Sequence, residues 1–308
     1  VLNQVSSSGL ADMTAGGTTA DDRLTLGARA RLDTSGLWTN QALAPGQTGA
    51  LPYLNGGTVS LRSNRDIDLQ AGSVIDVGSG AALRAKGKLT GGKGGSVTVE
   101  AVPGGAAGGG RVVLDAALRG YGVDGGGTLA VTAGKVVLGD RPADAGDDVL
   151  ALAAPFFQQG FSRYEITGSG GASVADNARI DVTMPVYRPV ADAAGLATGT
   201  PTGVALETGL PPVYLHNPVA GTVTRRRGAS LSLQSGRTVA LPGADADAAL
   251  TIGQGAQVAV DPGQAIQLRG AGQITVLGAL TAAGGKIDIR QLRPVSYTHL
   301  TLPTILLV

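Results

Sequence analysis

Cysteine is absent from the 308-residue chain, and aromatic residues make up only 3% of it. The lack of cysteine excludes disulfide frameworks and thiolate metal sites. It also suits a chain that crosses a membrane unfolded, although many cytosolic proteins lack cysteine as well. A compact core of this length usually contains more Phe, Tyr, Trp and Met. We therefore expect a narrow interior, a few side chains wide, filled by small aliphatic residues.

The net charge is also small, and long apolar runs are absent from the sequence. The formal charge is only +1, which provides no electrostatic footprint for nucleic acid, so we expect no nucleic-acid partner. No signal peptide is visible, and no apolar run is long enough to span a bilayer. The chain begins with Val1, in the middle of a pattern, and we expect it to be a fragment of a longer protein.

Glycine, in contrast, is abundant, with 50 residues, and pairs of glycines precede short apolar-polar alternations. This unit occurs at residues 56–61, 94–99 and 126–131, and more loosely at 109–114 and 284–289. Alternation at period two is typical of a half-buried strand, and a glycine pair permits a tight corner. Such a unit cannot bury its apolar face alone and must stack on its copies. The sequence therefore predicts an all-β fold, a β-solenoid.

The position after the glycine corner predicts which side chains face inward and stack in columns. These are Val59, Leu61, Val97, Val99, Val112, Leu114, Leu129 and Val131. If each coil takes roughly 20–25 residues, as in other short-repeat solenoids, the part of the chain outside the insertions makes about ten coils. With strands ~4.8 Å apart, the stack would be on the order of 50 Å long.

Two segments break this rhythm. In residues 147–157, acids precede an apolar run that contains Pro155, which predicts a short helical insertion. Residues 185–227 are rich in proline, which removes ladder donors, so we expect a loop excursion outside the coils. Its deletion should leave most of the β structure intact. We assign residues 1–294 to one domain, with the excursion at 183–229 within it.

The last residues, 295–308, differ abruptly in composition from the rest. They have no charged residue and no glycine corner, and they resemble the read-through translation of a transposon adapter used in sequencing libraries. We expect this tail to be an artefact that forms no regular strand; a native last strand is the alternative. Its exclusion removes His299 and leaves His216 as the one remaining histidine.

The order of several motifs resembles that of one family. The motifs are residues 32–40, 56–61, 71–77, 160–164, 184–187, 272–276 and 282–287. In this order they resemble the filamentous-haemagglutinin-type large exoproteins of Gram-negative bacteria. The likeness covers most of residues 23–289 and is closest to a shaft region of unknown role. The amino-terminal secretion domain of that family, with its Asn-Pro-Asn motifs, is missing here.

The resemblance implies a right-handed parallel β-helix that is exported by two-partner secretion. The implied partners are an outer-membrane β-barrel transporter and a protein or glycan on a host or neighbouring cell. The implied location is secreted or at the surface of a Gram-negative bacterium. We therefore expect a structural shaft segment of an adhesin-like exoprotein, without enzymatic activity or cofactor. The alternatives are a polysaccharide-active β-helix enzyme and the stalk of a contact-dependent toxin.

Carboxylates are the first candidates for chemistry, because sugar lyases and hydrolases also use parallel β-helices. The candidates on strands or at corners are Asp66, Asp68, Asp76, Asp181, Asp261 and Asp288. A catalytic pair needs controlled spacing beside a sugar-binding groove, and such grooves usually have aromatic platforms, which are scarce here. We expect each Asp to face outward or occupy a corner, where it keeps the surface polar, and we assign no catalytic residue.

The remaining candidates are few. Residues 91–95 resemble a glycine-rich Ca²⁺ loop, but the required acid is missing and Lys93 stands in the loop, so we reject a metal site. His216 has no second histidine nearby in the sequence, so we expect neither a metal site nor a Ser-His dyad there. The basic triplet 225–227 is either a grip for sulfated glycans or phosphate head groups, or a solvated loop. Trp38 and three phenylalanines, Phe156, Phe157 and Phe161, form either a recognition surface or pins that hold a loop or helix on the coils.

Overall fold

The computed structural model describes residues 2–4, 23–41, 54–84, 87–101, 110–219, 221–236 and 248–292. Within these ranges the protein is mostly β, with large parallel sheets and only a few short helices. No helix in the described part is long and apolar enough to cross a membrane. The predicted tail artefact at 295–308 lies outside the described residues.

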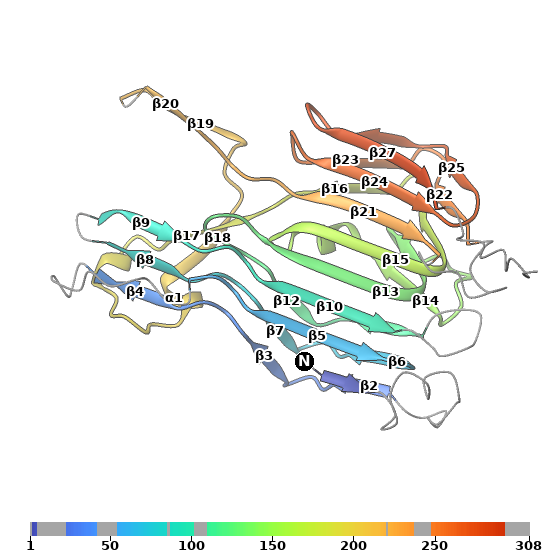
Figure 1. Cartoon of the computed structure of the whole chain (residues 1–308), viewed down its shortest axis with the longest axis horizontal. Helices are drawn as coiled ribbons and strands as arrows, with labels where there is room; N and C mark the ends of the chain where they lie inside the picture. The colour runs from blue at the N-terminus through green and yellow to red at the C-terminus, as the bar shows by residue number, and fades with distance from the viewer. Residues whose placement is uncertain are drawn as a thin grey trace, which may run out of the picture.

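One long parallel sheet organises the molecule, and successive passages of the chain add strands to it in sequence order (Figure 1). Its main path consists of β1 (Leu2–Gln4), β5 (Thr58–Ser63), β10 (Ser96–Ala101), β13 (Gly127–Leu138), β15 (Phe161–Val174), β21 (Ser230–Ser235), β24 (Ala265–Gly270) and β27 (Lys286–Gln291). Every neighbouring pair along this path is parallel. Each return of the chain thus places a new strand beside the last one, and we call one such circuit a coil.

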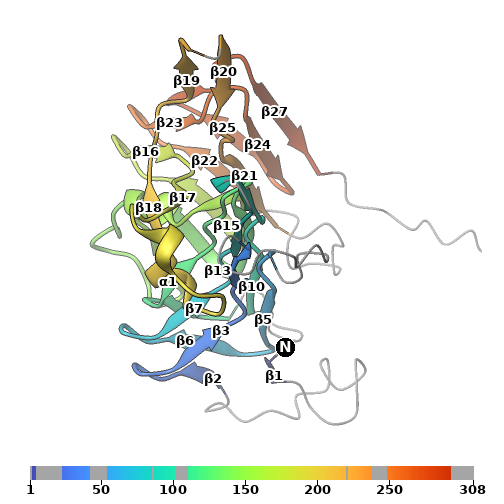
Figure 2. The ribbon, with the colours of Figure 1, turned by 90° about the vertical axis from the view of Figure 1, so that its left-hand side faces the viewer.

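Shorter parallel sheets carry the chain between these returns (Figure 2). They consist of β2 (Arg23–Leu26), β6 (Asp66–Leu69) and β11 (Val112–Leu114); of β3 (Arg31–Asp33), β7 (Val74–Asp76) and β12 (Ala117–Arg119); and of β16 (Arg179–Val182), β23 (Gln257–Val260) and β26 (Ala279–Thr281). Three further strands pair with the long sheet off its main path: β14 (Val149–Leu152), β22 (Leu250–Ile252) and β25 (Ile274–Val276). At one end, β4 (Trp38–Asn40), β8 (Ala81–Leu83) and β9 (Leu89–Gly91) form a small mixed sheet.

The register stacks apolar side chains in columns. Val97 lies opposite both Val59 and Leu129, and all three are buried. A parallel column joins Leu61, Val99 and Val131, which are buried as well. For these six residues the predicted inward orientation is confirmed. The columns continue through Tyr164, Leu231 and Ile266 in one case and Ile166, Leu233 and Leu268 in the other.

The loose copy at residues 109–114 is not equivalent to the others. Val112 and Leu114 belong to β11 and pair with Ile67 and Leu69 of β6, in a different sheet. Val112 is buried and Leu114 is half-buried, so both contact the interior, but neither joins the predicted columns. The glycine corner alone therefore does not determine which sheet receives the following strand.

The glycine pairs before β5, β10 and β13 stack directly on one another. A Cβ atom on Gly95 would clash with the carbonyl oxygen of Gly57, and one on Gly127 would clash with that of Gly95. Because the two backbones lie this close, the amide of Ser96 donates a hydrogen bond to Gly57 O at 2.9 Å. Backbone packs against backbone at these corners, which is why the repeated unit requires glycine there.

The predicted coil length and coil number are wrong. One coil takes the chain from Ile266 to Ile287 at its shortest and from Tyr164 to Leu231 at its longest. The main path contains eight described strands rather than about ten, and their stack is about 34 Å long at ~4.8 Å per step. The estimate failed because every coil along the main path except the last, from β24 to β27, is longer than 25 residues.

The predicted helix at residues 147–157 is wrong in its first half. Leu150 and Leu152 alternate with half-buried neighbours in β14, which pairs with residues 135–138 of β13. The helical part is a 3₁₀ helix, η3 (Ala154–Gln158), with Pro155 as its second residue. Asp148 precedes the strand, where its carboxylate lies 3.3 Å from the ammonium of Lys135.

The strands of the proline-rich excursion pair only with one another among the described residues. β17 (Val186–Pro189) is antiparallel to β18 (Leu206–Gly209), and β19 (Tyr214–Asn217) is antiparallel to β20 (Thr222–Arg225). Two short helices, η4 (Ala193–Gly195) and α1 (Thr202–Ala205), lie between the first pair. Figure 1 shows the β19–β20 hairpin extending away from the parallel strands.

The first half of the excursion nevertheless covers a second apolar core. This core contains Trp38 and Leu83 of the small mixed sheet. Against them pack three buried residues of the excursion, Tyr187, Ala193 and Leu206. The indole of Trp38 is fully buried and its Nε1 donates to Leu196 O at 3.4 Å. Trp38 therefore holds the excursion on the coils, as expected, and the excursion contributes more to the interior than its proline content indicates.

A candidate anion-binding groove

Arg226 anchors the point at which the excursion rejoins the long sheet. Its guanidinium donates to both carboxylate oxygens of Asp261, at 2.6 and 3.0 Å, and to the carbonyl oxygen of Met184 at 2.9 Å. The two side chains are only 6% and 4% exposed. Asp261 also accepts the amides of Met184, where the excursion leaves, and of Ala229, where it returns. Charge and hydrogen bonds are thus both satisfied at this buried pair.

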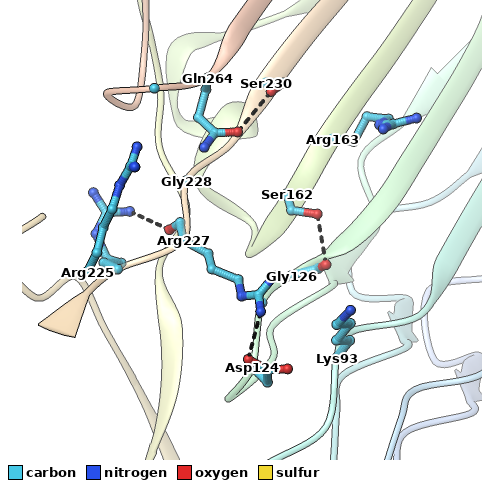
Figure 3. Close-up of a pocket in the computed structure, with 13 residues that line it drawn as sticks. Lys93, Asp124, Gly126, Ser162, Arg163, Arg225, Arg227, Gly228, Ser230 and Gln264 are labelled. Atoms are coloured by element: carbon cyan, nitrogen blue, oxygen red, sulfur yellow. Dashed lines mark hydrogen bonds and ion pairs between the residues drawn. The ribbon is translucent and has the colours of Figure 1, made fainter. Parts of the chain in front are cut away.

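Arg225 and Arg227, on either side of this anchor, are exposed and line a groove (Figure 3). Arg225 Nη2 donates to Pro262 O at 3.0 Å, and Arg227 Nη2 lies 3.3 Å from Asp124 Oδ1. Two glycines make room for these side chains. A Cβ on Gly263 would clash with Arg225 Nη2, and one on Gly125, whose φ is +110°, would lie 3.1 Å from Arg227 Cδ.

The groove has a volume of about 490 Å³ and is strongly polar. Lys93, next to β10, and Arg163 of β15 add two cations to its wall. Arg163 Nη1 is 3.4 Å from Glu165 Oε1, whereas Lys93 has no carboxylate within 4 Å among the described residues. Positive charge therefore exceeds negative charge around the groove.

Neutral hydrogen-bonding groups complete the lining. Ser162 Oγ donates to Gly126 O at 2.9 Å, and Ser230 Oγ donates to Gln264 Oε1 at 3.1 Å. The Nε2 group of Gln264 has no acceptor in the described part of the chain and remains available as a donor. None of the described residues that line the groove is aromatic. Such a surface can hold an anion that also carries hydroxyl groups.

The six predicted aspartates do not gather at this groove, and two of them are not surface residues. Asp76 and Asp261 are buried, which corrects the expectation that each Asp faces outward or occupies a corner and keeps the surface polar. Asp76 accepts the amide of Gly78 at 3.0 Å and lies 3.6 Å from both Arg31 and Arg119. Ion pairs and backbone donors therefore replace water around both carboxylates.

The other four aspartates are half-buried and lie on three strands. Asp66 accepts the amide of Arg111 at 2.9 Å, and Asp68 follows it on β6. Asp181 accepts from Arg179 Nε at 2.9 Å. Asp288 accepts from Arg290 Nε at 2.7 Å, and this hydrogen bond lowers the pKa of the Asp288 carboxyl. These contacts favour the interpretation that the acids maintain a charged, hydrated surface.

The phenylalanine cluster belongs to the interior. Phe157 and Phe161 are fully buried on either side of Tyr164, with ring centroids 5.4 and 5.9 Å from its ring. Burial raises the pKa of the Tyr164 hydroxyl, which accepts the amide of Gln159 at 3.1 Å. The alternative that these rings form a recognition surface is therefore wrong. The burial of Tyr164 was not predicted from the sequence, because its strand is not preceded by a glycine pair.

The rejected metal positions show purely structural contacts. In the loop at residues 91–95, a Cβ on Gly92 would clash with Leu54 O, and the amide of Lys93 donates to Asn55 Oδ1 at 2.9 Å. His216 is exposed on β19 of the projecting hairpin. Within the described ranges, no three His, Cys, Asp or Glu side chains come together in a way that could hold a metal ion.

Sequence reasoning identified only the Arg triplet of this groove. Lys93, Arg163 and Gln264 come from three other coils, and only the register of the long sheet brings them beside Arg225 and Arg227. No protein-family model, curated protein or solved structure matches the chain.

Proposed function

We propose that the chain is a right-handed parallel β-helix and that it serves as a rigid shaft segment. The observation that carries this proposal is the uninterrupted parallel pairing of the main path from β1 to β27. Strands along this path are hydrogen-bonded to the next coil, so the ladder runs along the axis of the stack. Bending the stack would separate strands on one side and open packed apolar columns, which makes the structure stiff.

The outer face of the long sheet supports the same role, because it is polar along the whole stack. Arg62 and Glu100, on adjacent strands, form an ion pair at 3.1 Å. On the last strand, Asp288 lies 3.3 Å from Lys286 and 2.7 Å from Arg290. Alternation therefore separates an apolar interior from a polar exterior, as a free-standing shaft requires.

For the biological setting, we propose a secreted or surface-tethered adhesin-like exoprotein of a Gram-negative bacterium. Its shaft would hold adhesive or toxic elements away from the cell after two-partner secretion through an outer-membrane β-barrel. Support comes from the order of the sequence motifs. An enzymatic role gains no support from the groove, because Asp124 is the one carboxylate among its described lining residues and is already engaged by Arg227.

Export can be tested by fusing residues 23–292 behind the amino-terminal secretion domain of a two-partner exoprotein. The fusion is expressed in a Gram-negative host with or without the cognate barrel. We expect the segment to be accessible to protease on intact cells only when the barrel is present. A segment that stays inside the cell with a working barrel, while the secretion domain alone is exported, would contradict the proposal.

The enzyme alternative has its own readout. Purified protein is incubated with a panel of acidic and neutral polysaccharides, and the release of reducing ends is measured. We expect none above the buffer control. Release that disappears in Asp124→Asn but persists in Asp181→Asn would replace the shaft proposal with a catalytic one.

A further inference from the structure

We propose that the groove beside Arg225 and Arg227 is a binding site for a phosphorylated sugar, with the phosphate monoester held by the cations. The site does not depend on the shaft proposal, because it rests on the lining residues alone. It would exist equally in a protein with another location or role. Figure 3 shows Arg225 on one side of the groove and Lys93 and Arg163 on the other, with Arg227 extending between them toward Asp124.

Charge balance is the first argument for a phosphate monoester. Arg226 is neutralised by Asp261 in the interior, which leaves Lys93, Arg163, Arg225 and Arg227 as the cations of the groove. Two carboxylates, Asp124 and Glu165, oppose them, so an excess of two positive charges remains. A phosphate monoester carries a charge of about −1.5 to −2 at neutral pH, which matches this excess. A guanidinium also matches the geometry of phosphate oxygens through paired donors.

The size and lining of the groove are the second argument, and they point to a sugar carrying that phosphate. A volume of about 490 Å³ is far larger than inorganic phosphate requires. Ser162, Ser230 and Gln264 line the remaining space with hydroxyl and amide groups, which are partners for sugar hydroxyls. Because the described lining includes no aromatic residue, charge and hydrogen bonds, rather than ring stacking, would hold the ligand.

Preorganisation is the third argument. The Arg226 side chain is buried, whereas its two neighbours are exposed beside the groove. The contact with Pro262 O fixes Arg225, and Gly263 and Gly125 leave the space that both arginines need. These two arginines are thus held in place before a ligand arrives, which lowers the entropy lost on binding.

The test measures binding of mannose 6-phosphate by isothermal titration calorimetry at low ionic strength. We expect saturable binding to the full chain. The double variant R225Q/R227Q should weaken it at least tenfold, because two of the phosphate contacts lose their charge. The matched control R179Q/R290Q removes two exposed arginines that pair with other aspartates, and it should change the affinity less than twofold.

Two further ligands separate the parts of the proposal. Mannose without phosphate should not bind measurably, and inorganic phosphate should bind at least tenfold more weakly than mannose 6-phosphate. Equal affinity for inorganic phosphate and mannose 6-phosphate would overturn the assignment of a sugar. The proposed site would be wrong if R225Q/R227Q left the affinity unchanged. It would also be wrong if the protein bound neither mannose 6-phosphate nor the vesicles described next.

The same chemistry can come from a free sugar phosphate or from a lipid headgroup. Phosphatidylcholine vesicles with and without phosphatidylinositol 4-phosphate distinguish these sources by co-sedimentation. Sedimentation that requires the phosphorylated lipid and is lost in R225Q/R227Q supports the site with a lipid source. No sedimentation, together with binding of mannose 6-phosphate, supports a soluble or glycan-borne source.

Folding of the variants is checked by circular dichroism. If R225Q/R227Q fails to fold, Lys93→Gln replaces it, because Lys93 lies on the opposite wall and its ammonium has no carboxylate partner among the described residues. Lys93→Gln should weaken mannose 6-phosphate binding at least threefold. An unchanged affinity in a folded Lys93→Gln protein would count against the proposal in the same way.

Discussion

At the scale of single residues, the stacked columns of the long sheet belong to the main apolar core. Val97 is fully buried and packs between Val59 and Leu129 of the adjacent strands. Val97→Asp would place an unpaired charge in this column. We expect a loss of about 3–5 kcal/mol in the free energy of unfolding, measured by urea denaturation. Thr98→Asp, one residue along the strand, is the control and should cost less than about 1 kcal/mol; equal costs would contradict the assigned orientation.

The buried Arg226–Asp261 pair offers a second residue-level prediction. Arg226→Met leaves the Asp261 carboxylate buried without its partner, which should cost about 3–5 kcal/mol. The double variant R226M/D261N removes that charge and keeps an acceptor for the amides of Met184 and Ala229. We therefore expect the double variant to unfold at higher urea concentration than R226M alone. A double variant as unstable as the sum of both single changes would show that the two side chains are not coupled.

Tyr187 should make stability depend on alkaline pH. Burial, together with the negative charge of Asp76, raises the pKa of Tyr187 to about 12. The folded protein thus favours the neutral phenol more than the unfolded chain does, so this contribution is complete below pH ~10 and is lost as the pH rises toward 12. Tyr187→Phe should flatten the decline of the melting temperature between pH 10 and 12. A decline as steep as in the unchanged protein would exclude this role.

Burial could be predicted from the sequence for the aliphatic residues but not for the acids. Alternation after a glycine corner identified Val97 and Leu129, because a strand has only two faces. Asp76 and Asp261 gave no local signal. Their burial depends on arginines from other coils, such as Arg226, which satisfy the charge only after the chain has folded.

At the scale of elements, strands were more predictable than their spacing. The glycine corners before β5, β10 and β13 mark strand starts that sequence alone identifies. The lengths of the insertions between strands carry no periodic signal, so the number of coils was overestimated. The segment around β14 was assigned to a helix because acids preceded an apolar run, whereas pairing with β13 makes it a strand.

Two deletions test how the excursion is divided. Replacing residues 186–209 by a Gly/Ser linker removes Tyr187 and Leu206 from the second core and should expose Trp38. Since Trp38 is the one tryptophan of the chain, its fluorescence emission should shift to longer wavelength. The control deletion of residues 214–224 removes only the projecting hairpin and should leave emission and melting temperature unchanged. A red shift in the control, or none in the first variant, would contradict this division.

At the scale of the whole molecule, both proposals depend on how the coils are stacked. The parallel sheets expected from the sequence are present, and the handedness of the coil stays a prediction. The groove could not be predicted, because the register of the long sheet brings Lys93, Arg163 and Arg227 together from distant coils. Local pattern predicts what forms a strand, whereas pairing between coils determines which surfaces meet.

The rigid stack is the central claim, and a distance measurement between its ends tests it most directly. Thr58 and Lys286 occupy equivalent exposed positions on β5 and β27, connected by register through the strands between them. Because the chain has no cysteine, T58C/K286C accepts two spin labels at defined sites. Six strand spacings of ~4.8 Å place the two backbones about 29 Å apart.

Double electron–electron resonance then gives the distribution of distances between the labels. The account predicts one narrow peak. After correction for the label linkers, its position should correspond to a backbone separation of about 29 Å. The peak should keep its position and width until the urea concentration at which the sheet unfolds. A broad or multiple distribution in native buffer, or a mean distance incompatible with six strand spacings, would contradict the rigid stack.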